Sequence, residues 1–234
     1  MRYAPRVTDT TRMVAEINYS GLHFLHGCCS DDNASLATGP AFKFGDVEIS
    51  PQAYYRYRLY DGKAYSSEEG VRLETGYSKP FYSLGLGVEA GKAQLIGIQV
   101  AGTAARGYLS ADISGTRSVT FGTTVRYERD SYPVPSQAFS APSVEFRSSF
   151  LGLWNLPTNT WVAALYRKYD GPTLTSSGVR IDRYLSLGAS VELDFVNIWG
   201  MSPSVGLAYE TQASNDQLGQ FNRVRFLLGV GKVF

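Results

Sequence analysis

The sequence predicts an all-β chain, an antiparallel transmembrane β-barrel of about twelve strands in an outer membrane. Three observations support this fold class. Long segments alternate apolar and polar residues with the period of two that a β-strand imposes. These segments run for roughly ten residues, the length that a tilted strand needs to cross a bilayer. The connections between them are alternately short and long, as in bacterial outer-membrane barrels.

Composition agrees with this fold class and narrows the function. The 234 residues include 16 Tyr, 12 Phe, 3 Trp and 24 Gly, and aromatic residues favour strands. The 22 Lys and Arg residues nearly balance the 21 Asp and Glu residues, so a nucleic-acid partner is not expected. The sequence has no apolar run of about 18 residues, the length of a transmembrane helix.

The alternation predicts the position of each strand. In one segment, Val119, Phe121 and Val125 share one face, whereas Thr120 and Gly122 share the other. The same test along the chain predicts strands near 12–25, 35–44, 48–59, 69–78, 81–90, 103–114, 118–128, 142–153, 159–169, 183–196, 203–212 and 222–234. Residues 90–103 are ambiguous, and we interpret them as a long outer loop that is partly strand. The count would rise to fourteen if they formed an extra hairpin, or if the chain were truncated at its N-terminus.

The polar faces of the predicted strands carry charges of both signs, which would form a wet lumen crossed by salt bridges inside a barrel. The predicted lumen-facing charges are Arg56, Arg58, Arg72, Glu74, Arg126, Glu128, Glu145, Arg147, Glu192, Asp194 and Arg225. Each acid has basic neighbours on its own face, which favours charge pairing over acid–base catalysis.

Catalytic, metal-binding and cofactor-binding patterns are not legible in the sequence. His23 and His26 fall on opposite faces of a strand, because three residues is an odd step. Cys28 and Cys29 are adjacent, which disfavours a disulfide between them and gives no spaced metal pattern. We therefore expect no enzymatic activity, no metal and no cofactor.

Aromatic residues gather near the ends of the predicted strands. Trp154, Trp161, Phe195 and Trp199 lie beside short turns, as in the interfacial girdle of a membrane barrel. The alternative is that they cap a soluble core.

The C-terminal segment "FNRVRFLLGVGKVF" continues the alternation to the last residue. Its apolar face includes Phe226, Leu228 and Val230, and the chain ends on Phe234. A soluble sheet would also accept this strand. Together with the alternation elsewhere, the segment resembles the terminal signal that the barrel assembly machinery recognises in outer-membrane proteins.

The last two hairpins carry a more specific set of positions: Arg180, Asp182, Gly200, Ser202, Pro203, Tyr209, Glu210, Ser214, Asn215, Asn222 and Arg223. This set resembles the C-terminal barrel of the surface lipoprotein assembly modifiers. The upstream stretch 37–78 looks like the early hairpins of the same family.

The resemblance implies a protein-export function. Members of the family join a periplasmic helical-repeat domain to an outer-membrane barrel and move lipoproteins or related soluble proteins to the cell surface. We accordingly expect a barrel over 12–234 and a periplasmic segment over 1–11, with truncation there because no signal-peptide core is present. The expected partners are outer-membrane lipid, the barrel assembly machinery and a client lipoprotein or secreted protein. The alternatives are a passive diffusion porin and a structural or adhesive barrel.

Overall fold

The structure, a computed structural model, describes residues 2–3, 7–8, 10–23, 30–115, 119–176, 178–196 and 202–231. Its elements are β-strands and three short 3-10 turns, η1 (Ile96–Ile98), η2 (Leu153–Asn155) and η3 (Gln217–Gly219). Within these residues, no helix has the length and apolar character needed to cross a membrane. The prediction of an all-β chain is confirmed.

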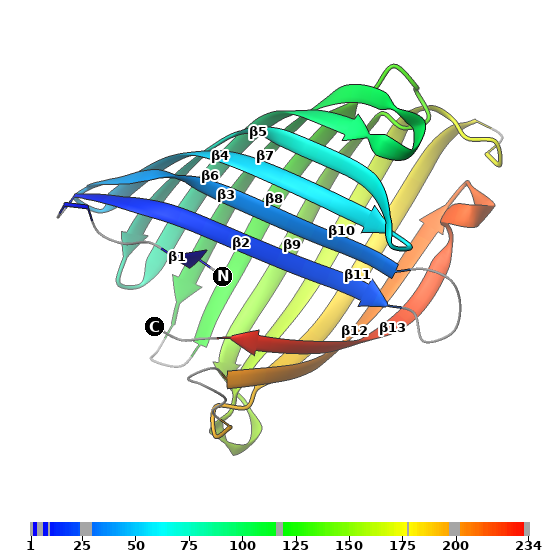
Figure 1. Cartoon of the computed structure of the whole chain (residues 1–234). Helices are drawn as coiled ribbons and strands as arrows, with labels where there is room; N and C mark the ends of the chain where they lie inside the picture. The colour runs from blue at the N-terminus through cyan, green and yellow to red at the C-terminus, as the bar shows by residue number, and fades with distance from the viewer. Residues whose placement is uncertain are drawn as a thin grey trace. The chain divides into compact units, whose positions relative to one another are not determined.

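Thirteen strands of the described chain form one sheet in which sheet order follows chain order (Figure 1). They are β1 (Arg2–Tyr3), β2 (Thr11–His23), β3 (Ser30–Phe44), β4 (Val47–Tyr60), β5 (Lys63–Lys79), β6 (Tyr82–Leu95), β7 (Val100–Ser114), β8 (Val119–Ser131), β9 (Phe139–Leu151), β10 (Pro157–Pro172), β11 (Val179–Glu192), β12 (Ser202–Ser214) and β13 (Phe221–Gly231). Each pair whose register is described is antiparallel. Twelve strands are long, as predicted; β1 was not predicted and pairs with β2 at Ala15 and Glu16.

Two connections differ from the sequence interpretation. After Tyr60 we expected a long polar loop, and this was wrong: Asp61 (φ 52°) and Gly62 (φ 69°) form a two-residue turn. Positive φ at both positions is the signature of the type I′ turn that an Asp-Gly pair favours in hairpins. We interpreted the ambiguous segment 90–103 as a long outer loop that is partly strand, and the long loop was wrong. The segment forms no extra hairpin either, because β6 continues to Leu95 and only η1 and Gln99 separate it from β7.

The contacts divide the chain into two compact units. Unit 1 contains 1–78, 85–108 and 128–140, and unit 2 contains 79–84, 109–127 and 141–234. We call the face with the large apolar side chains the apolar face of a unit, and the opposite one its polar face.

The burial of the two faces is the reverse of that in a soluble protein: polar side chains are buried on the polar face, and large apolar side chains are exposed on the apolar face. In unit 1, Ser50, Gln52 and Tyr54 are buried on the polar face of β4. In unit 2, Phe226 and Leu228 on the apolar face of β13 are 75% and 86% exposed. Large exposed apolar surfaces mark contact with a partner or a membrane, so these faces do not form the core of a soluble sandwich.

The β3–β4 ladder has a gap near its middle. The register pairs Thr38 with Ala53 and Phe42 with Ile49, and within this described segment no pair lies between them. The same register places Pro40 opposite Pro51, and proline has no backbone N–H to donate to a ladder. Beside the gap, a Cβ on Gly39 would collide with the carbonyl oxygen of Pro51. This position therefore requires glycine.

Replacing Gly39 by Ala is expected to destabilise the fold. The added Cβ meets rigid backbone of the next strand, so we expect a loss of about 1–3 kcal/mol, the usual range for overpacking. The measurement is the free energy of unfolding in urea, with the protein refolded in detergent micelles. Gly97→Ala is the matched control, because a Cβ at Gly97 meets nothing within 4 Å. Equal losses in both variants would contradict the prediction.

Candidate functional site

A network of ion pairs covers part of the polar face of unit 1, and Arg106 on β7 forms its first centre. Its guanidinium contacts Glu68 on β5, Glu128 on β8 at 2.9 Å and Asp130 at 3.4 Å. Glu68 and Asp130 are buried, and Glu68 also accepts a hydrogen bond from the Tyr54 hydroxyl. One guanidinium thus neutralises part of the charge of three carboxylates.

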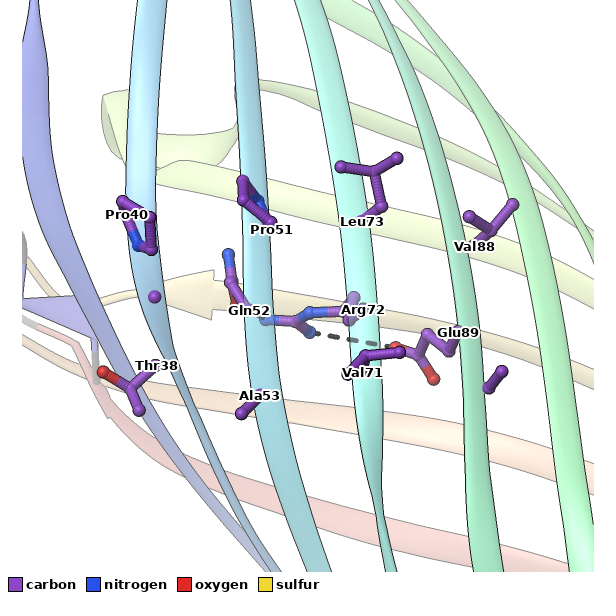
Figure 2. Close-up of a pocket in the computed structure, with 12 residues that line it drawn as sticks. Thr38, Pro40, Pro51, Gln52, Ala53, Val71, Arg72, Leu73, Val88 and Glu89 are labelled. Atoms are coloured by element: carbon purple, nitrogen blue, oxygen red, sulfur yellow. Dashed lines mark hydrogen bonds and ion pairs between the residues drawn. The ribbon is translucent and has the colours of Figure 1, made fainter.

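Arg72 on β5 forms a second centre of this network. It pairs with Glu16 on β2 at 3.1 Å, with Glu74 at 3.6 Å and with Glu89 on β6 at 3.9 Å. It also donates a hydrogen bond to the Gln52 side chain. Figure 2 shows Gln52, Arg72 and Glu89 on three neighbouring strands, with the ion pair drawn between Arg72 and Glu89. Alternation places these side chains on one face, because each strand contributes residues of one parity.

Arg56 connects the two centres. Its Nη1 lies 3.2 Å from Glu68 and its Nη2 lies 2.7 Å from Glu89. We call the whole set the arginine network: Arg56, Arg72, Arg106, Glu16, Glu68, Glu74, Glu89, Glu128 and Asp130. Carboxylates outnumber guanidiniums two to one, so each arginine is important for the balance of charge.

The structure brings together only some of the charges predicted to face a lumen. Four of them, Arg56, Arg72, Glu74 and Glu128, belong to the arginine network. The others form local contacts or lie exposed: Arg58 pairs with Asp31, Arg147 with Asp112 and Glu145, and Arg225 with Glu210, whereas Arg126 and Asp194 are exposed and Glu192 is half-buried. Their assignment to a lumen stays a prediction.

The sequence interpretation missed Glu16, Glu68, Glu89, Arg106 and Asp130. Glu68 was missed because residues 61–68 were assigned to a loop rather than to β5. Asp130 shares the parity of Arg126 and Glu128 on β8, so continuing the alternation along that strand would have found it. Glu16, Glu89 and Arg106 were missed because no charge was chosen on β2, β6 or β7.

A second polar cluster joins two turns of unit 2. Asp182 on β11 is 1% exposed. It accepts hydrogen bonds from Arg180 Nε at 2.9 Å and Nη2 at 2.8 Å, and from the Ser214 hydroxyl at 2.6 Å. Arg180 Nη1 lies 3.6 Å from Asp216, in the turn between β12 and β13. A buried carboxylate with these charge-assisted partners holds the two turns in one geometry.

Asp216 extends this cluster to the turn that follows β10. Its carboxylate accepts hydrogen bonds from the hydroxyls of Thr173 and Thr175, both at 2.6 Å, and from the Leu218 amide at 3.0 Å. We call the set Arg180, Asp182, Ser214, Asp216, Thr173 and Thr175 the hairpin cluster. Asn215 supports it, since its side chain accepts from the Ile181 amide and donates to the Val179 carbonyl.

Hydrogen bonds from Thr173 and Thr175 lower the pKa of the Asp216 carboxyl below its ordinary value of 3.8, and the Leu218 amide and Arg180 act in the same direction. The folded pKa is lower than the unfolded one, so this carboxylate stabilises the fold above the ordinary pKa. The contribution is lost as the pH falls through the lower, folded pKa.

We therefore expect Asp216→Asn to lower the free energy of unfolding at neutral pH. The difference between the variant and the wild type should shrink as the pH falls to about 3 and below. Urea unfolding across this pH range measures it. Asp194→Asn, at an exposed turn position, is the control, and a difference for Asp216→Asn that stays constant with pH would contradict the prediction.

A third cluster lies further along β12 and β13. Glu210 is buried and pairs with Arg223 Nε at 2.6 Å and with Arg225 Nη1 at 3.2 Å. Next to it, the Thr211 hydroxyl donates to the Asn222 side chain. The Glu210 contacts join the last two strands on their polar face, and the Thr211–Asn222 hydrogen bond joins them on the opposite face.

The remaining predicted positions are dispersed. Tyr209, Phe226 and Leu228 are exposed on the apolar face, Pro203 pairs with Val230 in the β12–β13 ladder, and Ser202 begins β12. Outside the described residues lie Gly200, Phe234, Trp199, His26, Cys28 and Cys29.

The aromatic residues predicted to form a girdle differ in their exposure, and the girdle itself stays a prediction. Trp154 and Phe195 are exposed near strand ends. Trp161 differs, because its ring lies against Gly188 of β11 on the polar face, where a Cβ would collide with it. Its indole N–H donates to the Ser186 hydroxyl at 3.4 Å. The small residue on the paired strand provides the space for this ring, which periodicity alone does not reveal.

The family model for the surface lipoprotein assembly modifier matches residues 115–234. The chain belongs to this family. The match confirms the resemblance inferred from the last hairpins and contains the whole hairpin cluster and the Glu210 contacts. Most of the arginine network lies before it. A comparison with curated proteins gives no match.

Two solved structures are similar to this chain. One is described as "Bacterial polysaccharide outer membrane secretin"; it is 16% identical, with a TM-score of 0.49, over 97% of this chain and 73% of that chain. The other is described under "Unveiling the Mechanism Behind the in-meso Crystallization of Membrane Proteins"; it is 13% identical, with a TM-score of 0.45, over 94% and 81% of the two chains. Structural similarities with TM-scores below 0.5 support no conclusion about function.

Proposed function

We propose that this chain is an outer-membrane barrel that translocates surface lipoproteins, or related secreted proteins, to the cell surface. The observation that carries the proposal is the family match over 115–234, within which the predicted motif residues meet in the hairpin cluster. The exposed apolar faces support a location in the bilayer, since outer-membrane strands place apolar residues toward lipid.

In this function the chain is a conduit and not an enzyme. The partners are outer-membrane lipid, the barrel assembly machinery that inserts the chain, and a client lipoprotein or secreted protein. The hairpin cluster fixes the turns at one end of the last strands, and the Glu210 contacts join β12 to β13. A client could cross inside the barrel or pair with a strand edge by β-augmentation, and both routes require these strands to hold their register.

The passive pore is the second candidate. The candidate pore loop was the segment 132–142, of which β9 takes the part from Phe139; the remaining loop 132–138 contains the buried residue Ala138. A passive pore would conduct ions steadily without a client, whereas the proposed function needs one.

The test is surface exposure of a client on intact cells. The chain would be expressed with a signal peptide, alongside a longer version that includes the upstream coding sequence. A lipoprotein encoded nearby would be co-expressed and labelled with antibody. We expect exposure that depends on the barrel and is lost in Asp182→Asn but kept in the control Asp194→Asn. If the client is exposed equally on cells that lack the barrel and on cells in which both versions are folded in the outer membrane, export of that client is excluded. Bilayer conductance then tests the passive pore.

A further inference from the structure

A groove of 570 Å³ lies over the middle of β3, β4, β5 and β6. Figure 2 shows residues from all four strands around it, among them Pro40, Pro51, Leu73 and Val88. At roughly 4.8 Å between neighbouring strands, the outer two are about 14 Å apart. Measured across the four strands, the groove is therefore long enough to hold an extended chain of atoms.

The groove opens on the apolar face of unit 1. Val71 is 65% exposed and Val88 is 49% exposed, and both contribute to its walls. Ala53 and Ala90 leave space between these larger side chains. Arg72 and Glu89 also border the groove, but their ion pair holds their side chains on the polar face. The lining is consequently almost wholly apolar.

The backbone beneath the groove directs its hydrogen-bonding groups along the plane of the sheet, toward neighbouring strands, and not into the groove. It includes Pro40 and Pro51, which face each other across the gap in the β3–β4 ladder and have no N–H. A peptide strand in this groove would leave its own polar backbone groups without partners, at a cost of desolvation. A hydrocarbon chain has no such groups to satisfy, so the chemistry of the walls favours it.

We propose that this groove binds an acyl chain of a membrane lipid. Inside a bilayer the gain comes from van der Waals contact, because an unfilled hollow loses the dispersion contacts of its lining. Lys92 and Glu69 lie exposed on the same face, and their opposite charges give no preference for a headgroup. The inference rests on the membrane location proposed above and is independent of export.

Photochemical labelling tests this site. The full chain would be reconstituted in nanodiscs that contain a phospholipid with a diazirine on its acyl chain, then irradiated, and adducts would be mapped by mass spectrometry. We expect adducts concentrated at Val71, Leu73 and Val88. Val162 on β10 is the internal control, because it is also 49% exposed on an apolar face but does not line the groove. Equal labelling of Val88 and Val162 would show ordinary contact with bulk lipid and overturn the proposal.

A variant that fills the groove gives an independent check. Val88→Trp should abolish the excess of adducts at Val71 and Leu73, whereas Val162→Trp should leave it intact. Both positions are exposed, so both variants should fold, which the electrophoretic shift between heated and unheated samples verifies. Persistence of the excess in folded Val88→Trp would overturn the proposal. Failure of the wild-type chain to insert into nanodiscs would instead count against the proposed membrane location.

Discussion

Replacing Asp182 by Asn is expected to destabilise the last hairpins by about 3 kcal/mol, near the lower end of the cost of breaking a buried ion pair. Asn has the shape of Asp and can still accept from Ser214, so the change removes mainly the negative charge. Arg180 then keeps Asp216 at 3.6 Å and the Tyr169 ring at 4.8 Å. The loss stays at the lower end because these two contacts remain.

Urea unfolding in micelles measures the effect, and Asp194→Asn provides the comparison at an exposed position. The double variant Arg180→Leu with Asp182→Leu should recover part of the stability, since replacing both members of a buried pair by apolar groups is often neutral. A single variant as stable as the wild type would show that the hairpin cluster contributes little to the fold.

Replacing Arg106 by Met is expected to have a larger effect, about 4–5 kcal/mol. Methionine replaces the unbranched stem of the side chain but leaves Glu68, Glu128 and Asp130 without their shared cation. Two of these carboxylates are buried, so their repulsion is weakly screened. Arg56 remains beside Glu68 and limits the loss.

Arg126→Met is the control, because Arg126 lies on the neighbouring strand and is exposed. Adding Glu68→Gln to Arg106→Met should restore part of the lost stability, and the double-mutant cycle gives the coupling energy between the two residues. Purely additive effects would mean that Arg106 acts through packing instead of charge.

Much of the fold could be predicted because the alternation of apolar and polar residues can be recognised within one strand, without knowledge of its neighbours. The twelve long strands all overlap their predicted ranges, and errors gather at strand ends. Asp61 and Gly62 show why: the sequence carried a hairpin signal, but the polar residues of β5 after it resembled a loop. Alternation is weak where both faces of a strand are polar, so the turn chemistry is the better guide there.

The polar clusters were less predictable. Arg180, Asp182 and Ser214 were identified as motif positions, but not their contact with Asp216 or with Thr173 and Thr175. Those contacts join two turns about 40 residues apart, and strand periodicity does not report which turns touch. Similarly, Arg106 and Glu68 meet because β5 and β7 present the same face, which requires knowledge of the whole sheet.

The meander order of the sheet bears on how the chain assembles. Each strand from β1 to β13 pairs with its neighbours in the chain, so most contacts are formed by closing one short hairpin at a time. The entropy cost of each closure is small, and folding dominated by local pairing is fast. The difficulty lies in register, because a slip of one residue would exchange the two faces of a strand. A pair between adjacent strands such as Glu210 with Arg223, in which the carboxylate is buried, penalises such a slip, because the wrong register would leave a buried charge without its partner.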